Sequence, residues 1–139
     1  MADSILQNTH IPNFNRLNEI FEEERDSHRA SGFNKRLVQW INDFHRSLDD
    51  EYEAGACLTS FGQSVTFHIE DIGYWNPAII SFKGFTEDGN PVELIQHISQ
   101  ISILLVKLKR KKLEEPKRPI GFASWEQYDK QYDKEVLRT

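Results

Sequence analysis

The side chains best suited to chemistry lie along residues 64–70, where apolar and polar residues alternate. Thr66, His68 and Glu70 would share one face of a strand, because side chains two residues apart point to the same side. A histidine oriented by a carboxylate can act as a general base, so His68 and Glu70 could serve a hydrolase or transferase. The same alternation is typical of the solvent face of an antiparallel sheet. No nucleophile or metal motif accompanies the pair, and we assign no catalytic residue.

A second group of candidates is Tyr74, Trp75 and Asn76, within residues 70–77, which we predict to be a loop. Aromatic side chains on loops can stack on nucleic-acid bases or anchor interfaces. The alternative is that both rings fold back over the core, with Asn76 and Pro77 forming a turn. We therefore take the three residues as candidate ligand contacts.

Seven lysine and arginine residues fall within residues 107–118. Such a cluster can bind phosphate groups, and we select Arg110, Lys117 and Arg118 as candidate ligand contacts. The alternative is a solvated connector, or a surface that faces the acidic N-terminal helices. The 139-residue chain has a formal net charge of −5, which argues against a nucleic-acid partner.

Metal and thiol chemistry have little support in the sequence. No two of the five histidines stand four residues apart on one predicted helix, and HExxH and CxxC motifs are missing. We predict no metal site and no cofactor. The single cysteine, Cys57, fits a reducing cytosol. If residues 56–61 and 64–70 form a hairpin, Cys57 lies one or two positions from His68, although a small strand residue is the simpler interpretation.

Hydrophobic spacing predicts two N-terminal helices. One begins near Asn15, and residues 26–32 separate it from a second helix over residues 33–48. The second helix has a polar face that includes Asn42. Its apolar stripe consists of Phe33, Leu37, Trp40, Ile41, Phe44 and Leu48. That stripe needs a surface to cover.

The middle of the chain has the alternation and turn residues of strands. We predict strands at 56–61, 64–70 and 79–85, with turns at Gly62 and at residues 87–90. Residues 92–108 fit either a helix or a strand. Their β-branched content favours a strand that bends near residues 97–99.

The C-terminal part begins with a basic connector over residues 109–119. Ser124 and Gln127 then have the spacing of a capping box. Trp125, Tyr128 and Tyr132 follow at helical spacing, and we expect this aromatic stripe to dock on the chain's own sheet or on a neighbouring subunit.

Together these elements predict an α+β fold, in which N-terminal helices pack on a curved antiparallel sheet of four or five strands. We expect a flexible arm at 1–14, a single domain at 15–122 and a short amphipathic helix at 123–139. An open sheet has exposed edges, and oligomerisation is one way to cover them, so we expect a homo-oligomer. Since no secretion signal or membrane-length apolar run is present, we expect a cytoplasmic protein without a membrane partner.

Four segments carry a family resemblance over about residues 52–122. The segments are Ala56–Asp71, Gly73–Pro77, Gly89–His97 and Lys117–Phe122. They resemble a small uncharacterised bacterial or phage domain family of unknown function. The resemblance implies no activity and no functional residues.

The function that we predict is a non-enzymatic binding protein for a small anionic or nucleotide-like ligand. One version is a phage anti-defence protein that sequesters a nucleotide signal, because such proteins are also small, acidic and oligomeric. A second prediction is a protein–protein adaptor or inhibitor acting through the C-terminal helix. A third is a small hydrolase or transferase centred on His68 and Glu70.

Overall fold

The computed structural model describes residues 14–60 and 62–137, so the predicted arm at 1–14 lies outside them except for Phe14. Its helices are α2 (Phe14–Ser27), α3 (Ala30–Ser47), the 3₁₀ helix η1 (Ile98–Gln100) and α4 (Trp125–Leu137). Its strands are β1 (Tyr52–Ser60), β2 (Gln63–Trp75), β3 (Ile79–Thr86), β4 (Pro91–His97) and β5 (Leu104–Lys109). No helix in this part of the chain is long and apolar enough to cross a membrane.

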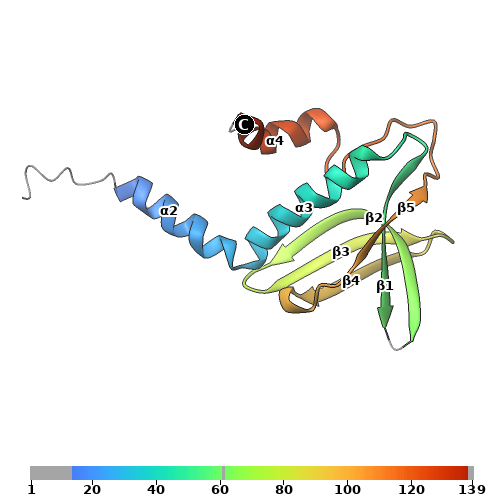
Figure 1. Cartoon of the computed structure of the whole chain (residues 1–139), viewed down its shortest axis with the longest axis horizontal. Coiled ribbons are helices and arrows are strands. Elements are labelled where there is room, and N and C mark those ends of the chain that lie inside the picture. The colour runs from blue at the N-terminus through green and yellow to red at the C-terminus, as the bar shows by residue number, and fades with distance from the viewer. Residues whose placement is uncertain (1–13, 61, 138–139) are drawn as a thin grey trace, which may run out of the picture.

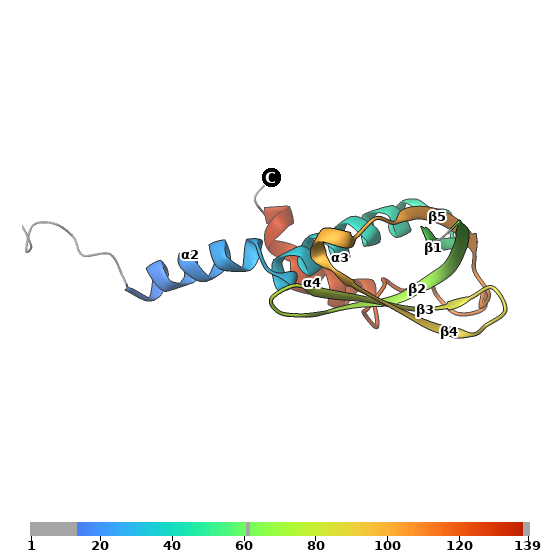
Figure 2. The same cartoon turned by 90° about the horizontal axis from the view of Figure 1, so that it is seen from below.

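The five strands form one antiparallel sheet in the order β4-β3-β2-β1-β5, which confirms the predicted α+β class. Successive strands from β1 to β4 are neighbours, as expected for hairpins. Gly62 and Gly89 adopt φ values of 77° and 85°, which are easily reached only by glycine, and this explains why the chain turns at both predicted positions. Figure 2 shows the strong curvature of the sheet.

Helix α3 lies across one face of the sheet, whereas α2 extends away from it (Figure 1). The largest fully buried apolar side chains come from α3, β2 and β3: Ile41, Phe67, Ile80 and Phe82. One member of the predicted stripe departs from this pattern, because Trp40 is exposed. Its position at the margin of the stripe puts it beside the contact with the sheet and not within it.

Strand β2 is longer than predicted, since pairing with β3 continues as far as Trp75 opposite Ile79. The predicted loop at 70–77 is therefore wrong for most of its length, and the turn is confined to residues 76–78. A β-bulge between Ile69 and Asp71 interrupts the alternation that the sequence pattern had assumed.

The prediction of one bent strand over 92–108 is also wrong. The chain does bend at the expected place, but it forms β4 and β5 on opposite edges of the sheet, joined by η1. Partly buried Ile98, Ile101 and Ile103 pack on the core between the two strands. A sequence pattern identifies strand-forming segments, but it does not reveal which neighbour each will pair with.

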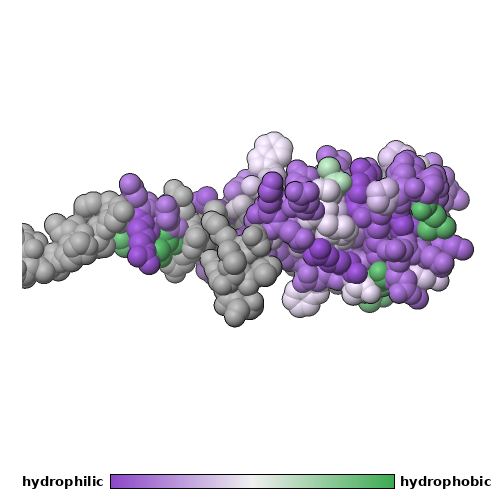
Figure 3. All heavy atoms as spheres, turned by 90° about the horizontal axis from the view of Figure 1, so that it is seen from above, coloured by the Kyte–Doolittle hydropathy of each residue, from purple (hydrophilic) through white to green (hydrophobic). Residues whose placement is uncertain are grey.

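Helix α4 begins with the predicted capping contact, in which the backbone N–H of Gln127 donates to Ser124 Oγ over 3.1 Å. The Gln127 side chain accepts a bond from the backbone of Ala123, one residue earlier than in a standard capping box. The face seen from the α4 side is predominantly hydrophilic (Figure 3). This surface fits a helix whose aromatic stripe is turned inward.

Candidate functional site

A cleft of about 830 Å³ lies between the connector that follows β5 and the sheet. We call it the connector cleft. Its walls are residues 110–112 and 115–123 on one side, and residues from β1, β2 and β3 on the other. Three of the predicted ligand contacts in the basic run, Arg110, Lys117 and Arg118, line it together with Glu70. The volume is in the range of small-molecule sites.

Asn42 of α3 holds the inner wall of this cleft. Its side-chain Oδ1 accepts from the Ile120 backbone N–H over 2.7 Å, and its Nδ2 donates to the Ile120 carbonyl over 3.2 Å. Asn42 is fully buried, so its predicted place on a solvent-facing side of the helix is wrong. A buried amide is favourable here because it satisfies both backbone groups of Ile120, which would otherwise be left without partners.

His45 lies one turn further along α3 and makes the second contact with the connector. Its Nε2 donates to the Arg118 carbonyl over 2.7 Å, while its Nδ1 accepts from the Ala54 backbone N–H over 3.0 Å. These partners select the neutral ring with hydrogen on Nε2. Burial lowers the pKa of His45 below its ordinary value, which favours the same neutral form.

Helix α4 covers the outside of the connector. Trp125 Nε1 donates to the Lys117 carbonyl over 3.1 Å, and the Trp125 ring lies 6.0 Å from that of His45. Tyr128 and Tyr132 make edge-on contacts with Phe122, and burial raises the pKa of Tyr128 to about 12. The three aromatic residues predicted for an interface thus pack on α3 and the connector of their own chain.

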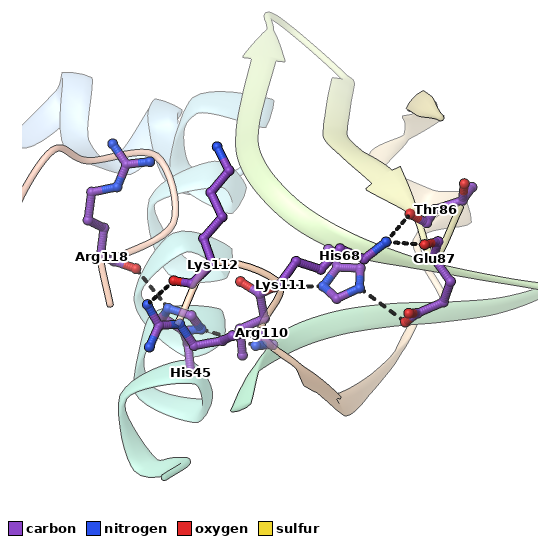
Figure 4. A network of polar contacts seen from close by, with 10 residues as sticks. His45, His68, Thr86, Glu87, Arg110, Lys111, Lys112 and Arg118 are labelled. Carbon is purple, nitrogen blue, oxygen red and sulfur yellow. Dashed lines mark hydrogen bonds and ion pairs between the residues drawn. The ribbon is translucent and has the colours of Figure 1, made fainter. Parts of the chain in front are cut away.

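Three cations of the basic run are committed to backbone carbonyls. The Arg110 guanidinium donates to the carbonyls of Asp50, Lys112 and Glu115. Lys111 Nζ donates to the carbonyls of Thr86 and Glu87, as drawn in Figure 4.

Lys117 Nζ donates to the carbonyls of Leu48 and Asp49 after the end of α3, and burial lowers its pKa. Like Arg110 and Lys111, this side chain fastens the connector to the fold. The charged groups of these three residues therefore bind backbone carbonyls at the margins of the cleft.

Three other cations at the cleft have no side-chain partner within the described residues: Lys83, Lys112 and Arg118. Figure 4 shows the Lys112 and Arg118 side chains extending in the same direction from the connector. Lys83 comes from β3, where it stands opposite Asp71 of β2. Glu53, Glu70, Asp71 and Glu115 also line the cleft, so its lining has both signs of charge with cations in excess.

His68 is held in a separate network beside the cleft and is 1% exposed. Its Nδ1 lies 2.7 Å from Glu53 Oε1 and its Nε2 lies 3.0 Å from Glu87 Oε1. The ring stacks on Phe85 with centroids 5.0 Å apart. Since carboxylates only accept hydrogen bonds, the network is fully satisfied when both ring nitrogens carry hydrogen and the imidazolium lies between two carboxylates.

The carboxylates bonded to His68 are therefore Glu53 and Glu87, and not the Glu70 chosen from the alternating pattern. Glu70 is the extra residue of the β2 bulge and has no partner residue on β3. Its carbonyl accepts from the Gly121 backbone N–H, which ties the bulge to the connector. The bulge breaks the period of two on which the predicted pair depended.

Tyr74, Trp75 and Asn76 lie at the far end of β2, and none of them lines the connector cleft. Asn76 Oδ1 accepts from the Ser31 backbone N–H over 2.9 Å, and the Pro77 carbonyl accepts from Ala30 over 2.7 Å. This turn therefore caps the start of α3, whose own N-cap residue makes no side-chain capping bond. Trp75 is 79% exposed, so it is not a lid on the core.

Cys57 is a partly buried residue of β1, opposite Thr66 and two positions from the Gly55–His68 pair. The predicted separation of one or two positions from His68 is confirmed. Both ring nitrogens of His68 are bonded to carboxylates, which leaves neither to activate the thiol. Among the described residues, no group of three or more potential ligands could hold a metal ion.

Sequence reasoning missed four residues that shape the cleft: Asn42, His45, Lys83 and Lys112. Asn42 and His45 stand three residues apart on α3, which places both on one side of the helix, and a polar pair next to an apolar stripe is the signal that could have drawn attention to them. Lys83 and Lys112 carried no distinguishing signal, because an exposed lysine in a strand or a connector is common.

Residues 25–123 match DUF6173, a family of unknown function, and the chain therefore belongs to this family. The match includes α3, the whole sheet and the connector, and it ends just before α4. No curated protein and no solved structure matches the chain.

Proposed function

We propose that this protein is a non-enzymatic binding protein that holds a small anionic ligand in the connector cleft. The observation that carries the proposal is the set of three cations without partners, Lys83, Lys112 and Arg118, around a cleft of about 830 Å³. Charge-assisted hydrogen bonds from lysine and arginine are the usual means of holding phosphate and carboxylate groups. The backbone of the connector is bonded to α3 at Arg118 and Ile120, so the backbone that carries the Arg118 side chain is held in place without a ligand.

The charges favour a small ligand over a nucleic acid. The chain is acidic overall, and the carboxylates of Glu70 and Asp71 share the cleft with the cations. A long polyanion would meet repulsion from these carboxylates, whereas a ligand with one anionic end can contact the cations alone. Phe85 and Phe122 supply apolar surface in the same lining.

A nucleotide-like molecule belongs to this ligand class, and the sequestration of a nucleotide signal is one biological role that would use it. Base stacking would then involve Phe85 or Phe122, because Tyr74 and Trp75 lie outside the cleft. The other predicted functions have less support. The aromatic face of α4 is occupied by its own chain, and a substrate cannot reach the buried ring nitrogens of His68 without displacing Glu53 or Glu87.

Isothermal titration calorimetry of the full chain with inorganic phosphate, pyrophosphate and AMP tests the proposal. We expect binding of at least one probe, and a loss of roughly 10- to 100-fold in affinity for Arg118→Ala and for Lys112→Ala, because each removes a charge-assisted contact. Lys35→Ala removes an exposed cation of α3 outside the cleft and serves as the matched control. Raising the salt concentration should weaken binding in the wild type.

Three outcomes would overturn the proposal. The first is no heat with any probe, together with no retained small molecule in native mass spectra of protein purified from lysate. The second is equal affinity in the wild type and both cleft variants. The third is an equal loss in Lys35→Ala, which would make the effect one of net charge.

A further inference from the structure

Besides the connector cleft, the free edge of β4 is a surface that could bind a partner. In the sheet β4 has β3 on one side and no strand on the other among the described residues. Figures 1 and 2 show this edge at the outer margin of the sheet, where η1 lies only at its C-terminal end. Pro91, Glu93, Ile95 and His97 form its exposed side, and Ile95 is 63% exposed. An uncovered edge with an exposed aliphatic side chain is a template for pairing with another strand.

The pattern of backbone bonds to β3 shows which groups of β4 face outward. The N–H of Thr86 donates to the Asn90 carbonyl, and the N–H of Ile98 donates to the Ala78 carbonyl. Opposite residues of an antiparallel pair alternate between bonded and non-bonded positions, so even-numbered residues 90–98 bond to β3. The N–H and carbonyl groups of Glu93, Ile95 and His97 therefore point to the free edge. The N–H of His97 already donates to Gln100 Oε1 over 3.0 Å, so among the described residues the groups open to a partner are those of Glu93 and Ile95 and the His97 carbonyl.

The exposed side chains of β4 would be complementary to those of β4 in a second copy of the chain. If two copies of β4 pair antiparallel about Ile95, Ile95 stands opposite the same residue of the second copy and Glu93 stands opposite His97. Directly opposed side chains that form a hydrogen bond stabilise a strand pair. His97 Nδ1 accepts from the Ser99 backbone N–H over 3.1 Å, which leaves its Nε2–H free to donate to a carboxylate.

The opposite edge of the sheet lacks this complementarity. The N–H of Arg110 donates to the Glu51 carbonyl, so by the same parity Leu105, Lys107 and Lys109 present their backbone groups outward on β5. Antiparallel pairing of two β5 strands about Lys107 would oppose like charges. Edge lysines are a common protection against such pairing.

We propose that a second copy of this chain pairs with the β4 edge, through antiparallel β4 strands centred on Ile95, to form a two-fold symmetric dimer with a continuous sheet. A two-fold contact uses the same patch on both subunits, and the Glu93-Ile95-His97 pattern satisfies this requirement. The proposal is independent of the proposed ligand, because no residue of β4 lines the connector cleft.

Sedimentation velocity of the full chain across a concentration series tests the association. We expect a monomer–dimer equilibrium whose dissociation constant rises at least tenfold in Ile95→Lys, because two lysines would then stand opposite each other. Leu104→Lys changes an equally exposed leucine on β5 and should leave the equilibrium unchanged. Glu93→Lys should weaken the dimer by removing the acceptor opposite His97, and the double variant Glu93→Lys/His97→Glu should restore it by placing a lysine opposite a glutamate.

Cysteine cross-linking then tests the register. In a Cys57→Ser background, Ile95→Cys should form a covalent dimer under mild oxidation by oxidised glutathione, since directly opposed residues lie within disulfide reach. Glu93→Cys should not, because its copies would be separated by four residues along the strands. A monomeric wild type at all concentrations would overturn the proposal, as would a dimer that is lost in Leu104→Lys and kept in Ile95→Lys. Equal cross-linking by both cysteine variants would overturn the register.

Discussion

Two histidines are buried among the described residues, and they differ in the charge of the groups that they bind. His45 is bonded to a backbone N–H and a backbone carbonyl, and both partners are uncharged at every pH. His68 is bonded to two carboxylates, so its network contains two groups that carry negative charge when they are ionised. The first histidine joins helix, sheet and connector, and the second joins β1, β2 and the β3–β4 turn.

The difference shows that burial alone does not decide how a histidine contributes to stability. The two backbone partners of His45 are compatible with one protonation state of the ring. His45 therefore contributes to stability through its hydrogen bonds and not through its charge. Carboxylate partners make the His68 network depend on charge balance and on ionic strength, because Glu53 and Glu87 are 21% and 59% exposed and are partly screened. Three variants sharpen this comparison.

The largest expected effect is that of His45→Ala, with a loss of about 3–4 kcal/mol in the free energy of unfolding. It leaves the N–H of Ala54 and the carbonyl of Arg118 without their partner and opens a cavity beside Trp125. Urea denaturation followed by circular dichroism measures the loss, and we expect no dependence on salt. Exposed His28→Ala is the control and should change stability by less than about 0.5 kcal/mol. A stable His45→Ala variant would show that the connector is held elsewhere.

A smaller loss, about 2 kcal/mol, is expected for His68→Leu, which keeps an apolar group beside Phe85 but leaves two carboxylates facing each other without a donor. Added salt should recover part of this loss by screening the repulsion. The same denaturation series at two salt concentrations measures it. If salt recovers stability equally in His45→Ala and His68→Leu, the proposed contrast between the two sites is wrong.

The smallest effect is the pH dependence that comes from His45. Its pKa in the folded protein is below the ordinary value of 6.5, so the unfolded chain binds more protons as the pH falls through 6.5. The stabilisation is fully present above this pH and is lost as the pH falls below it. Comparison of wild type with His45→Gln from pH 7.5 to roughly 5.5 isolates the contribution, since glutamine does not titrate. Parallel pH curves for the two proteins would contradict the assignment.

Sequence patterns predicted most of the elements because each is encoded locally. The helical stripe of α3, the turns at Gly62 and residues 87–90, and the capping serine of α4 all depend on neighbours within one or two turns. The candidate site was predicted only in part. Arg110, Lys117 and Arg118 do line the connector cleft, but His68, Tyr74 and Trp75 do not.

The sequence by itself determined the α+β class, most of the helices and strands and the basic connector, because amphipathic periods and turn residues act over a few residues. Only the tertiary structure decided that Asn42 would be buried, that Glu53 and Glu87 would replace Glu70 beside His68, and that β4 and β5 would lie on opposite edges. These outcomes depend on a bulge and on pairing between distant segments. Such contacts depend on the packing of the whole chain, and a local hydrophobic pattern in the sequence does not predict them.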